Sequence, residues 1–271
     1  MADDEGNTAL ASRRGFGPMT VWFRPIREGA SSEHGTAPSA RRAGMATLGV
    51  VAMLVAVNVA EHVLDVGAWL GAVVAVGLLV YARWSGLSWS ELGLGRERLG
   101  SGARWAVGAV AVIAGVYMFA VLLPTTRVMF LDDRYHLSLR GALLSAFVII
   151  PAGTVLVEEI AFRSVLWGML ARHARTVRVL IASSAMFGLW HILPSLHLAS
   201  ANRGVGDAFS STGRAATVLV VAATVGFTAI GGAVAGELRR RSGSLLASVG
   251  MHWATNALGV LFGVVAWRLA G

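Results

Sequence analysis

The chain contains 271 residues, of which 55% are hydrophobic and only 14% are charged. A soluble domain carries about 25% charged residues, so this composition excludes an ordinary water-exposed globular protein. The net charge is +8, but all 23 basic residues are Arg and lie scattered between apolar runs. This scatter indicates that the arginines set the membrane topology and contact phospholipids, and it argues against nucleic-acid binding. Because no Cys is present, disulfides, thiolate metal ligands and cysteine nucleophiles are excluded.

The N-terminal 42 residues are polar and rich in Gly, Ser and Arg, without the apolar run of a signal peptide. They predict a disordered cytoplasmic tail. From Gly44 onward, apolar runs approach the roughly 20 residues that a helix needs to cross a bilayer. Residues 43–271 are therefore predicted to form an all-α domain, a polytopic transmembrane helical bundle. About seven spans are expected, near residues 44–63, 66–82, 103–123, 141–162, 177–194, 215–236 and 245–267.

The arginines also predict an orientation. Most of the 23 fall in segments that lie on the same side of the membrane as the N-terminal tail. The positive-inside rule then predicts a multi-pass protein of the cell membrane with a cytoplasmic N-terminus and an outward C-terminus.

A few polar residues lie inside the predicted spans, where an ionisable group costs about 3 kcal/mol and usually serves a function. Two adjacent acids, Glu158 and Glu159, follow the apolar stretch of the fourth span. His191 ends the fifth span, and His252 and Asn256 lie within the seventh.

Helical spacing separates the two acids. Glu159 and Arg163 are four residues apart, with the acid on the favourable N-terminal side, so a structural ion pair is the preferred interpretation. Adjacent helical residues point about 100° apart, so Glu158 is free to face another partner. Two neighbouring carboxylates with different surroundings can take different chemical roles.

The remaining polar residues are expected to lie at similar depths in the membrane. Glu158 lies 16 residues before Ala174, in the turn between the fourth and fifth spans, and His191 lies 17 residues after it. In an antiparallel helix pair both side chains would lie roughly 24 Å from the turn. Since His252 and Asn256 fall in mid-bilayer on one helix face, all four are expected to form one cluster.

Three tetrads stand in order along the apolar helices: Glu158-Glu159 with Arg163, Phe187 with His191, and His252 with Asn256. They resemble the EExxxR, FxxxH and HxxxN pattern of the CPBP family, the CAAX proteases and bacteriocin-processing proteins also called Abi, which includes the type II CAAX prenyl endopeptidases. The resemblance covers about residues 45–268. We interpret Phe187 as packing that shapes the pocket of His191.

The resemblance implies an intramembrane endopeptidase acting on a membrane-associated or lipidated peptide or protein in the lipid bilayer. In this scheme Glu158, with His191, activates a water molecule, and His252 and Asn256 stabilise the oxyanion. A carboxylate and an imidazole–amide pair suit these roles chemically. His191, His252 and Glu158 also match a zinc hydrolase ligand set. A zinc mechanism and a metal-free glutamate mechanism both remain open, because the same residues serve either.

Other protease chemistries fit less well. No HExxH pattern of a zinc protease occurs, and no Ser in a GxSG-like setting pairs with the intramembrane His residues. Residues 204–207 spell the GxGD motif of aspartyl intramembrane proteases, but they fall in a polar loop and no span contains an Asp, so we interpret the match as chance. The alternative function is a non-catalytic immunity or scaffold protein of the same fold.

Overall fold

A computed structural model describes residues 40–63 and 69–271 of the chain. They fall in a unit that spans Pro38–Gly271, whereas a second unit, Met1–Ala37, lies outside the described residues. The predicted disordered tail therefore falls almost wholly outside the described part, and its last residues, from Ala40, are helical.

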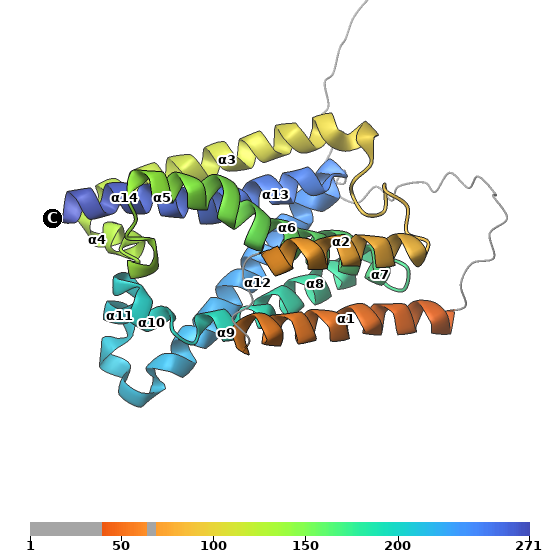
Figure 1. Cartoon of the computed structure of the whole chain (residues 1–271), viewed down its shortest axis with the longest axis horizontal. Coiled ribbons are helices and arrows are strands. Elements are labelled where there is room, and N and C mark those ends of the chain that lie inside the picture. The colour runs from red at the N-terminus through yellow and green to blue at the C-terminus, as the bar shows by residue number, and fades with distance from the viewer. Residues whose placement is uncertain (1–39, 64–68) are drawn as a thin grey trace, which may run out of the picture. The chain divides into compact units, whose positions relative to one another are not determined.

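The described residues form helices and contain no strand; one isolated bridge joins Asp132 to Asn202 (Figure 1). The α-helices are α1 (Ala40–Val63), α2 (Trp69–Trp84), α3 (Leu99–Leu122), α4 (Pro124–Arg127), α5 (Leu139–Leu144), α6 (Leu156–Glu158), α7 (Trp167–Ala171), α8 (Thr176–Trp190), α9 (Ile192–Ser195), α10 (Leu198–Ala201), α11 (Arg203–Phe209), α12 (Ala216–Ser242), α13 (Leu245–Trp253) and α14 (Gly259–Ala270). Short 3₁₀ segments connect them: η2 (Arg96–Arg98), η3 (Val128–Phe130), η4 (Asp133–Tyr135) and η8 (Ser210–Ala215).

Several of these pieces join into longer helices through π-helical turns. The segments η5 (Ser145–Ile149), η6 (Pro151–Val155) and η7 (Glu159–Leu166) continue α5 through α6 into α7. Pro151 has no N–H to donate, so the regular hydrogen-bond ladder is interrupted there, and π-helical turns stand on both sides of it. A fourth π-helical turn, η9 (Ala254–Leu258), joins α13 to α14.

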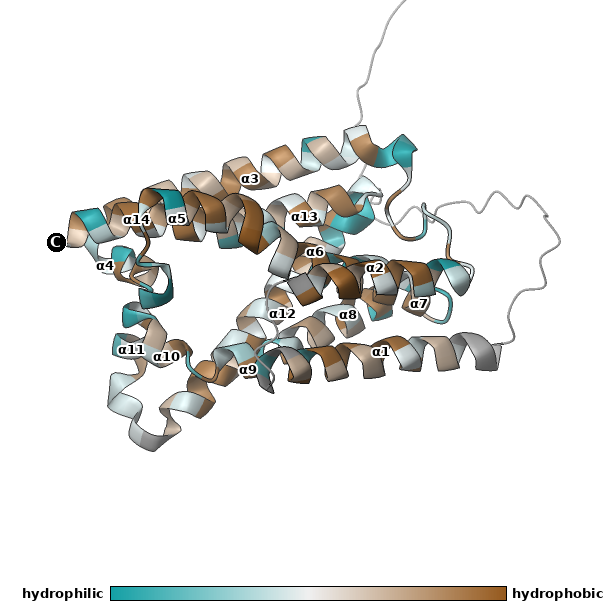
Figure 2. Ribbon diagram, viewed as in Figure 1, coloured by the Kyte–Doolittle hydropathy of each residue, from teal (hydrophilic) through white to brown (hydrophobic). Residues whose placement is uncertain are grey.

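Among the described residues, four helices are long and apolar enough to cross a membrane: Arg96–Leu122, Leu139–Ala171, Ala216–Ser242 and Leu245–Ala270. Figure 2 shows apolar residues along most of their length. The other three expected spans correspond to the shorter apolar helices Gly44–Ala60, Leu70–Trp84 and Thr176–Trp190. The all-helical membrane class is thus established, while the number of seven spans stays a prediction.

The core lies where these helices meet. α8 packs along α12, and α13 packs along α3. A Cβ placed on Gly188 would lie 2.7 Å from the Val225 carbonyl oxygen, and one on Gly236 would lie 2.6 Å from Leu180 Cδ1. At Gly188 the close atom belongs to the backbone and cannot move aside, so glycine there permits the approach of α8 and α12. Gly243, with φ 71°, ends α12, and Ser244 caps α13 by accepting a hydrogen bond from the Leu246 N–H.

Candidate active site

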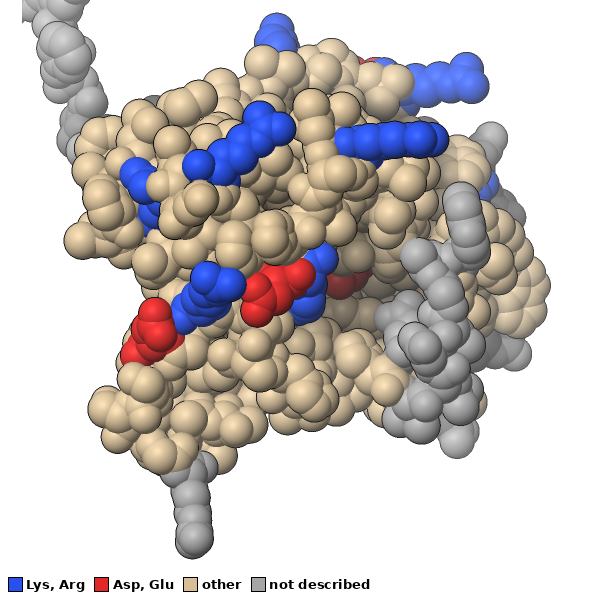
Figure 3. Space-filling view, turned by 60° about the vertical axis from the view of Figure 1, so that its left-hand side comes forward, with Lys and Arg blue, Asp and Glu red and all other residues tan. Residues whose placement is uncertain are grey.

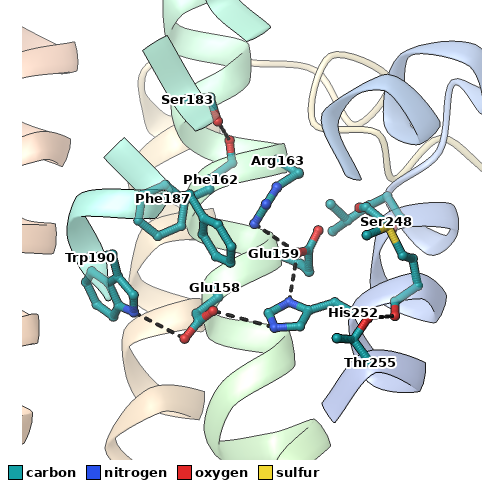
Figure 4. A network of polar contacts seen from close by, with 12 residues as sticks. Glu158, Glu159, Phe162, Arg163, Ser183, Phe187, Trp190, Ser248, His252 and Thr255 are labelled. Atoms are coloured by element: carbon teal, nitrogen blue, oxygen red, sulfur yellow. Dashed lines mark hydrogen bonds and ion pairs between the residues drawn. The ribbon is translucent and has the colours of Figure 1, made fainter. Parts of the chain in front are cut away.

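The two adjacent acids of the Leu139–Ala171 helix are buried and face different partners (Figure 4). Glu159 is fully buried, and its Oε1 atom lies 3.0 Å from Arg163 Nη1. The same oxygen accepts a hydrogen bond of 2.9 Å from His252 Nδ1. The ion pair predicted from the i,i+4 spacing is therefore present, and it is extended by a histidine that the spacing did not predict.

Glu158 faces the other way. Its Oε1 atom accepts a hydrogen bond of 3.1 Å from the indole N–H of Trp190, whereas Oε2 accepts none from the described residues. Two imidazole nitrogens lie close to Oε2: His252 Nε2 at 3.7 Å and His191 Nε2 at 3.9 Å. One carboxylate oxygen is thus held in place, and the other is buried without a hydrogen-bond partner among the described residues.

The hydrogen bonds of the two imidazoles define which nitrogen carries the proton. His191 Nδ1 lies 2.8 Å from the Phe187 carbonyl oxygen, which can only accept, so Nδ1 is the donor. His252 Nδ1 likewise donates to Glu159, and Asn256 Nδ2 lies 3.3 Å from His252 Nε2, to which it can donate. In the neutral imidazoles Nε2 therefore carries the lone pair, and in His252 that lone pair accepts from Asn256.

The family model described as "Type II CAAX prenyl endopeptidase Rce1-like" matches residues 140–258. This segment is similar to that family. No curated protein and no solved structure matches the chain.

The Rce1-like segment contains all seven residues that the tetrads single out, from Glu158 to Asn256. The resemblance inferred from those tetrads is thereby confirmed: residues 140–258 are similar to a family of proteases, in a chain with helices long and apolar enough to cross a membrane. Glu158, His191, His252 and Asn256 are predicted from the sequence to form one cluster, and the structure brings these side chains together from the Leu139–Ala171 helix, the end of α8, α13 and η9.

Phe187 lies at the centre of this Rce1-like site. Its ring stacks edge-on against His191, with centroids 4.7 Å apart, and edge-on against His252 at 5.8 Å. The Arg163 guanidinium carbon lies 3.8 Å from the centre of the same ring, a cation–π contact. Phe187 therefore packs against both imidazoles and the arginine, which agrees with its interpretation as a packing residue.

A cavity of about 610 Å³ opens beside Glu158. Trp190, His191 and Asn256 also line it, and it extends to Asp132 and Arg134 in the loop around η4. Its size is within the range of ligand-binding clefts, roughly 300–1,000 Å³. Figure 3 shows acidic and basic side chains gathered beside a hollow on the face turned toward the viewer.

The far end of this cavity is polar. Asp132 is buried and accepts hydrogen bonds of 2.9 and 2.7 Å from Arg134 Nε and Nη2. Burial opposes the charge of this carboxylate, but Arg134 and Asn202 outweigh it, so the pKa of Asp132 lies below its ordinary value. Asn202 also donates to the Met129 carbonyl oxygen at 3.0 Å, which ties the α10–α11 connection to η3.

Sequence reasoning missed two of these features. The position of Trp190 beside His191 in the FxxxH tetrad is the only signal in the sequence for its contact with Glu158. Nothing in the local sequence around Asp132 indicates its burial or its pairing with Asn202.

The zinc ligand set considered from the sequence fits this site in chemistry: His191, His252 and Glu158 supply suitable donor atoms. A search of residues 40–63 and 69–271 finds no ready-made group of three His, Cys, Asp or Glu side chains for a metal ion. The steps proposed below are assigned to the side chains of the chain itself.

Proposed function

We propose that the chain is an intramembrane endopeptidase of the cell membrane that hydrolyses a peptide bond of a membrane-associated or lipidated peptide or protein. The observation that carries this proposal is the unpartnered Oε2 of Glu158, which faces two imidazole nitrogens at the wall of a 610 Å³ cavity. The similarity of residues 140–258 to a protease family supports the same activity.

The first chemical step assigned to this site is attack by water. A water molecule placed beside Glu158 Oε2 can donate one proton to the carboxylate while its oxygen attacks the scissile carbonyl carbon. General-base catalysis of this kind contributes typically 10²–10⁴-fold. The Trp190 N–H holds Oε1, so Oε2 is directed toward the water. His191, anchored by the Phe187 carbonyl, orients the same water through its Nε2 lone pair.

The second step is collapse of the tetrahedral intermediate. Its oxyanion is stabilised by the amide N–H of Asn256 and by His252, which takes up a proton from solvent before the attack so that Nε2 also donates. Glu159 accepts from His252 Nδ1 and balances the charge of that imidazolium, while Arg163 compensates Glu159. The carbon–nitrogen bond breaks as Glu158 returns the proton to the leaving nitrogen, which gives a carboxylic acid and an amine. The proton of the acid then passes to the amine, and the products leave as a carboxylate and an ammonium group.

A survey of peptide termini tests this function. Membrane and secreted proteins of the native host would be compared between the wild type and chromosomal Glu158→Gln and Asp207→Asn strains that express equal amounts of protein. Asp207 is an exposed acid of α11 and serves as the matched control, because it also tests the GxGD motif. Termini that vanish with Glu158→Gln and persist with Asp207→Asn are expected. Unchanged termini in both strains would favour a non-catalytic immunity or scaffold protein.

Chelation tests the metal-free step, and labelling tests the orientation. Activity is expected to survive dialysis against a strong zinc chelator, and full loss that added zinc restores would require a metal mechanism. Because the chain has no Cys, single substitutions can report the side of the membrane. An impermeant thiol reagent is expected to label Ser211→Cys from outside and Ser90→Cys only after permeabilisation; the reverse pattern would overturn the cytoplasmic placement of the N-terminus.

A further inference from the structure

A second hollow, lined mostly by apolar residues, shares no lining residue with the cavity beside Glu158. It has a volume of about 520 Å³ and is bounded by residues of α3, α12 and α13. We call it the α3–α12 groove; its walls include Gly108, Ala109 and Val112 of α3, Val234 and Leu238 of α12, and Met251 of α13.

One charged side chain stands at the end of this groove. Arg104 lines it together with apolar residues, is exposed, and has no hydrogen bond or ion pair with the described residues. The acid next to Leu238 is already neutralised, since Glu237 is bound by Arg240 and Arg241 at 2.7 and 2.6 Å. Among the described residues that line the groove, Arg104 is therefore a cation without a partner, and none is an acid.

The position of the groove relates it to a lipid leaflet. α3 and α12 both belong to segments long and apolar enough to cross a membrane, and polar residues gather near the N-terminal end of α3 (Figure 2). Arg104 lies about one and a half turns into α3, which places it near the headgroup level. From Arg104 to Ile113 the wall runs roughly 13.5 Å along the helix into the apolar region.

We propose that the α3–α12 groove binds an anionic phospholipid, with the phosphate at Arg104 and an acyl chain along the wall from Gly108 to Ile113. A free phosphate would use only the cation, whereas the length and apolar character of the wall match a hydrocarbon chain. The lack of a protein partner for Arg104 and the positive N-terminal end of α3 both favour a negative headgroup.

The wall provides a direct way to fill the groove. A Cβ on Gly108 would meet no atom within 4 Å, so a larger side chain can occupy the hollow without displacing the backbone. Gly115, on the same helix, has equally open surroundings but does not line the groove. Gly108→Leu and Gly115→Leu both raise helix propensity by about 1 kcal/mol, so they form a matched pair.

Native mass spectrometry of the purified full chain tests the proposal. The protein would be titrated with phosphatidylglycerol or phosphatidylcholine, and the fraction that retains a lipid would be measured for wild type, Arg104→Gln, Gly108→Leu and Gly115→Leu. We expect wild type and Gly115→Leu to prefer phosphatidylglycerol. Arg104→Gln should lower that preference about fivefold, the effect of one basic residue at a membrane surface. Gly108→Leu should lower retention of both lipids.

Three results would overturn the proposal. Equal retention by all four proteins would show that bound lipid lies elsewhere. Loss of lipid retention in Gly115→Leu as large as in Gly108→Leu would show a general effect on α3. If the wild type is a dimer and Gly108→Leu alone dissociates it, the groove is covered by a second copy of the chain.

Discussion

The buried pair of Glu159 and Arg163 gives the sharpest test of how the site is held. Their side chains are 0% and 2% exposed, so Arg163→Met leaves a carboxylate uncompensated inside the bundle. Breaking such a pair costs about 3–5 kcal/mol. The cation–π contact with Phe187, worth up to about 2 kcal/mol when desolvated, is lost with it and is included in that range.

The double variant Glu159→Gln/Arg163→Met separates stability from function. Replacing both members of a buried pair by neutral groups is often close to neutral, so the double variant should be more stable than Arg163→Met alone. A glutamine at position 159 can still accept from His252 Nδ1, but it carries no charge to balance the imidazolium. We therefore expect stability to be regained while peptidase activity stays at least about tenfold below wild type.

The free energy of unfolding would be measured by titrating the protein in detergent micelles with a denaturing detergent and extrapolating linearly to zero denaturant. Arg140→Met is the control, because Arg140 is exposed and should change stability by less than about 0.5 kcal/mol. The reasoning is refuted if Arg163→Met costs less than about 1 kcal/mol, or if the double variant is less stable than the single one.

Three further predictions follow from the same geometry. Trp190→Phe removes the hydrogen bond to the Glu158 carboxylate, worth about 1.5–3 kcal/mol, so activity should fall roughly 10- to 100-fold in an initial-rate assay; a rate within twofold of wild type would contradict the positioning role. Gly232→Ala places a Cβ 3.2 Å from both Arg163 Nη2 and Phe187 Cδ1, so it should lower activity more than Gly231→Ala, whose Cβ meets nothing within 4 Å; equal rates would contradict this. The depressed pKa of Asp132 means that its stabilising contribution is complete above its ordinary value of 3.8 and is lost as the pH falls through the lower folded value. In melting curves between pH 6 and 3, the thermal stability of the wild type should thus fall more steeply with decreasing pH than that of Asp132→Asn. Identical profiles would exclude the Asp132–Arg134 pair as the cause of the acid destabilisation.

The sequence predicted the cluster because its geometry depends on distances along helices. Glu158 and His191 are nearly equidistant from the turn that joins their helices, and the structure places the nearest of their side-chain atoms 3.9 Å apart. The i,i+4 spacing similarly predicted the contact between Glu159 and Arg163.

Contacts that depend on the rotation of a third helix were not predictable in this way. His252 donates to Glu159 because α13 is turned about its axis by its packing on α3 and η7, which the hydrophobic pattern does not determine. π-helical turns around Pro151 and at η7 also change which residues share a face of the Leu139–Ala171 helix. The hydrogen bond from Trp190 to Glu158 likewise depends on side-chain rotation, about which spacing carries no information.

One measurement tests the central claim most directly. The purified full chain would be reconstituted in vesicles with a peptide identified by the terminus survey, and cleavage would be followed in water enriched in ¹⁸O. The account predicts one ¹⁸O atom in each new carboxylate and a loss of rate of about 10²–10⁴-fold in Glu158→Gln, with an unchanged melting curve. Turnover by Glu158→Gln within tenfold of wild type would contradict the role of Glu158 as the base that activates water.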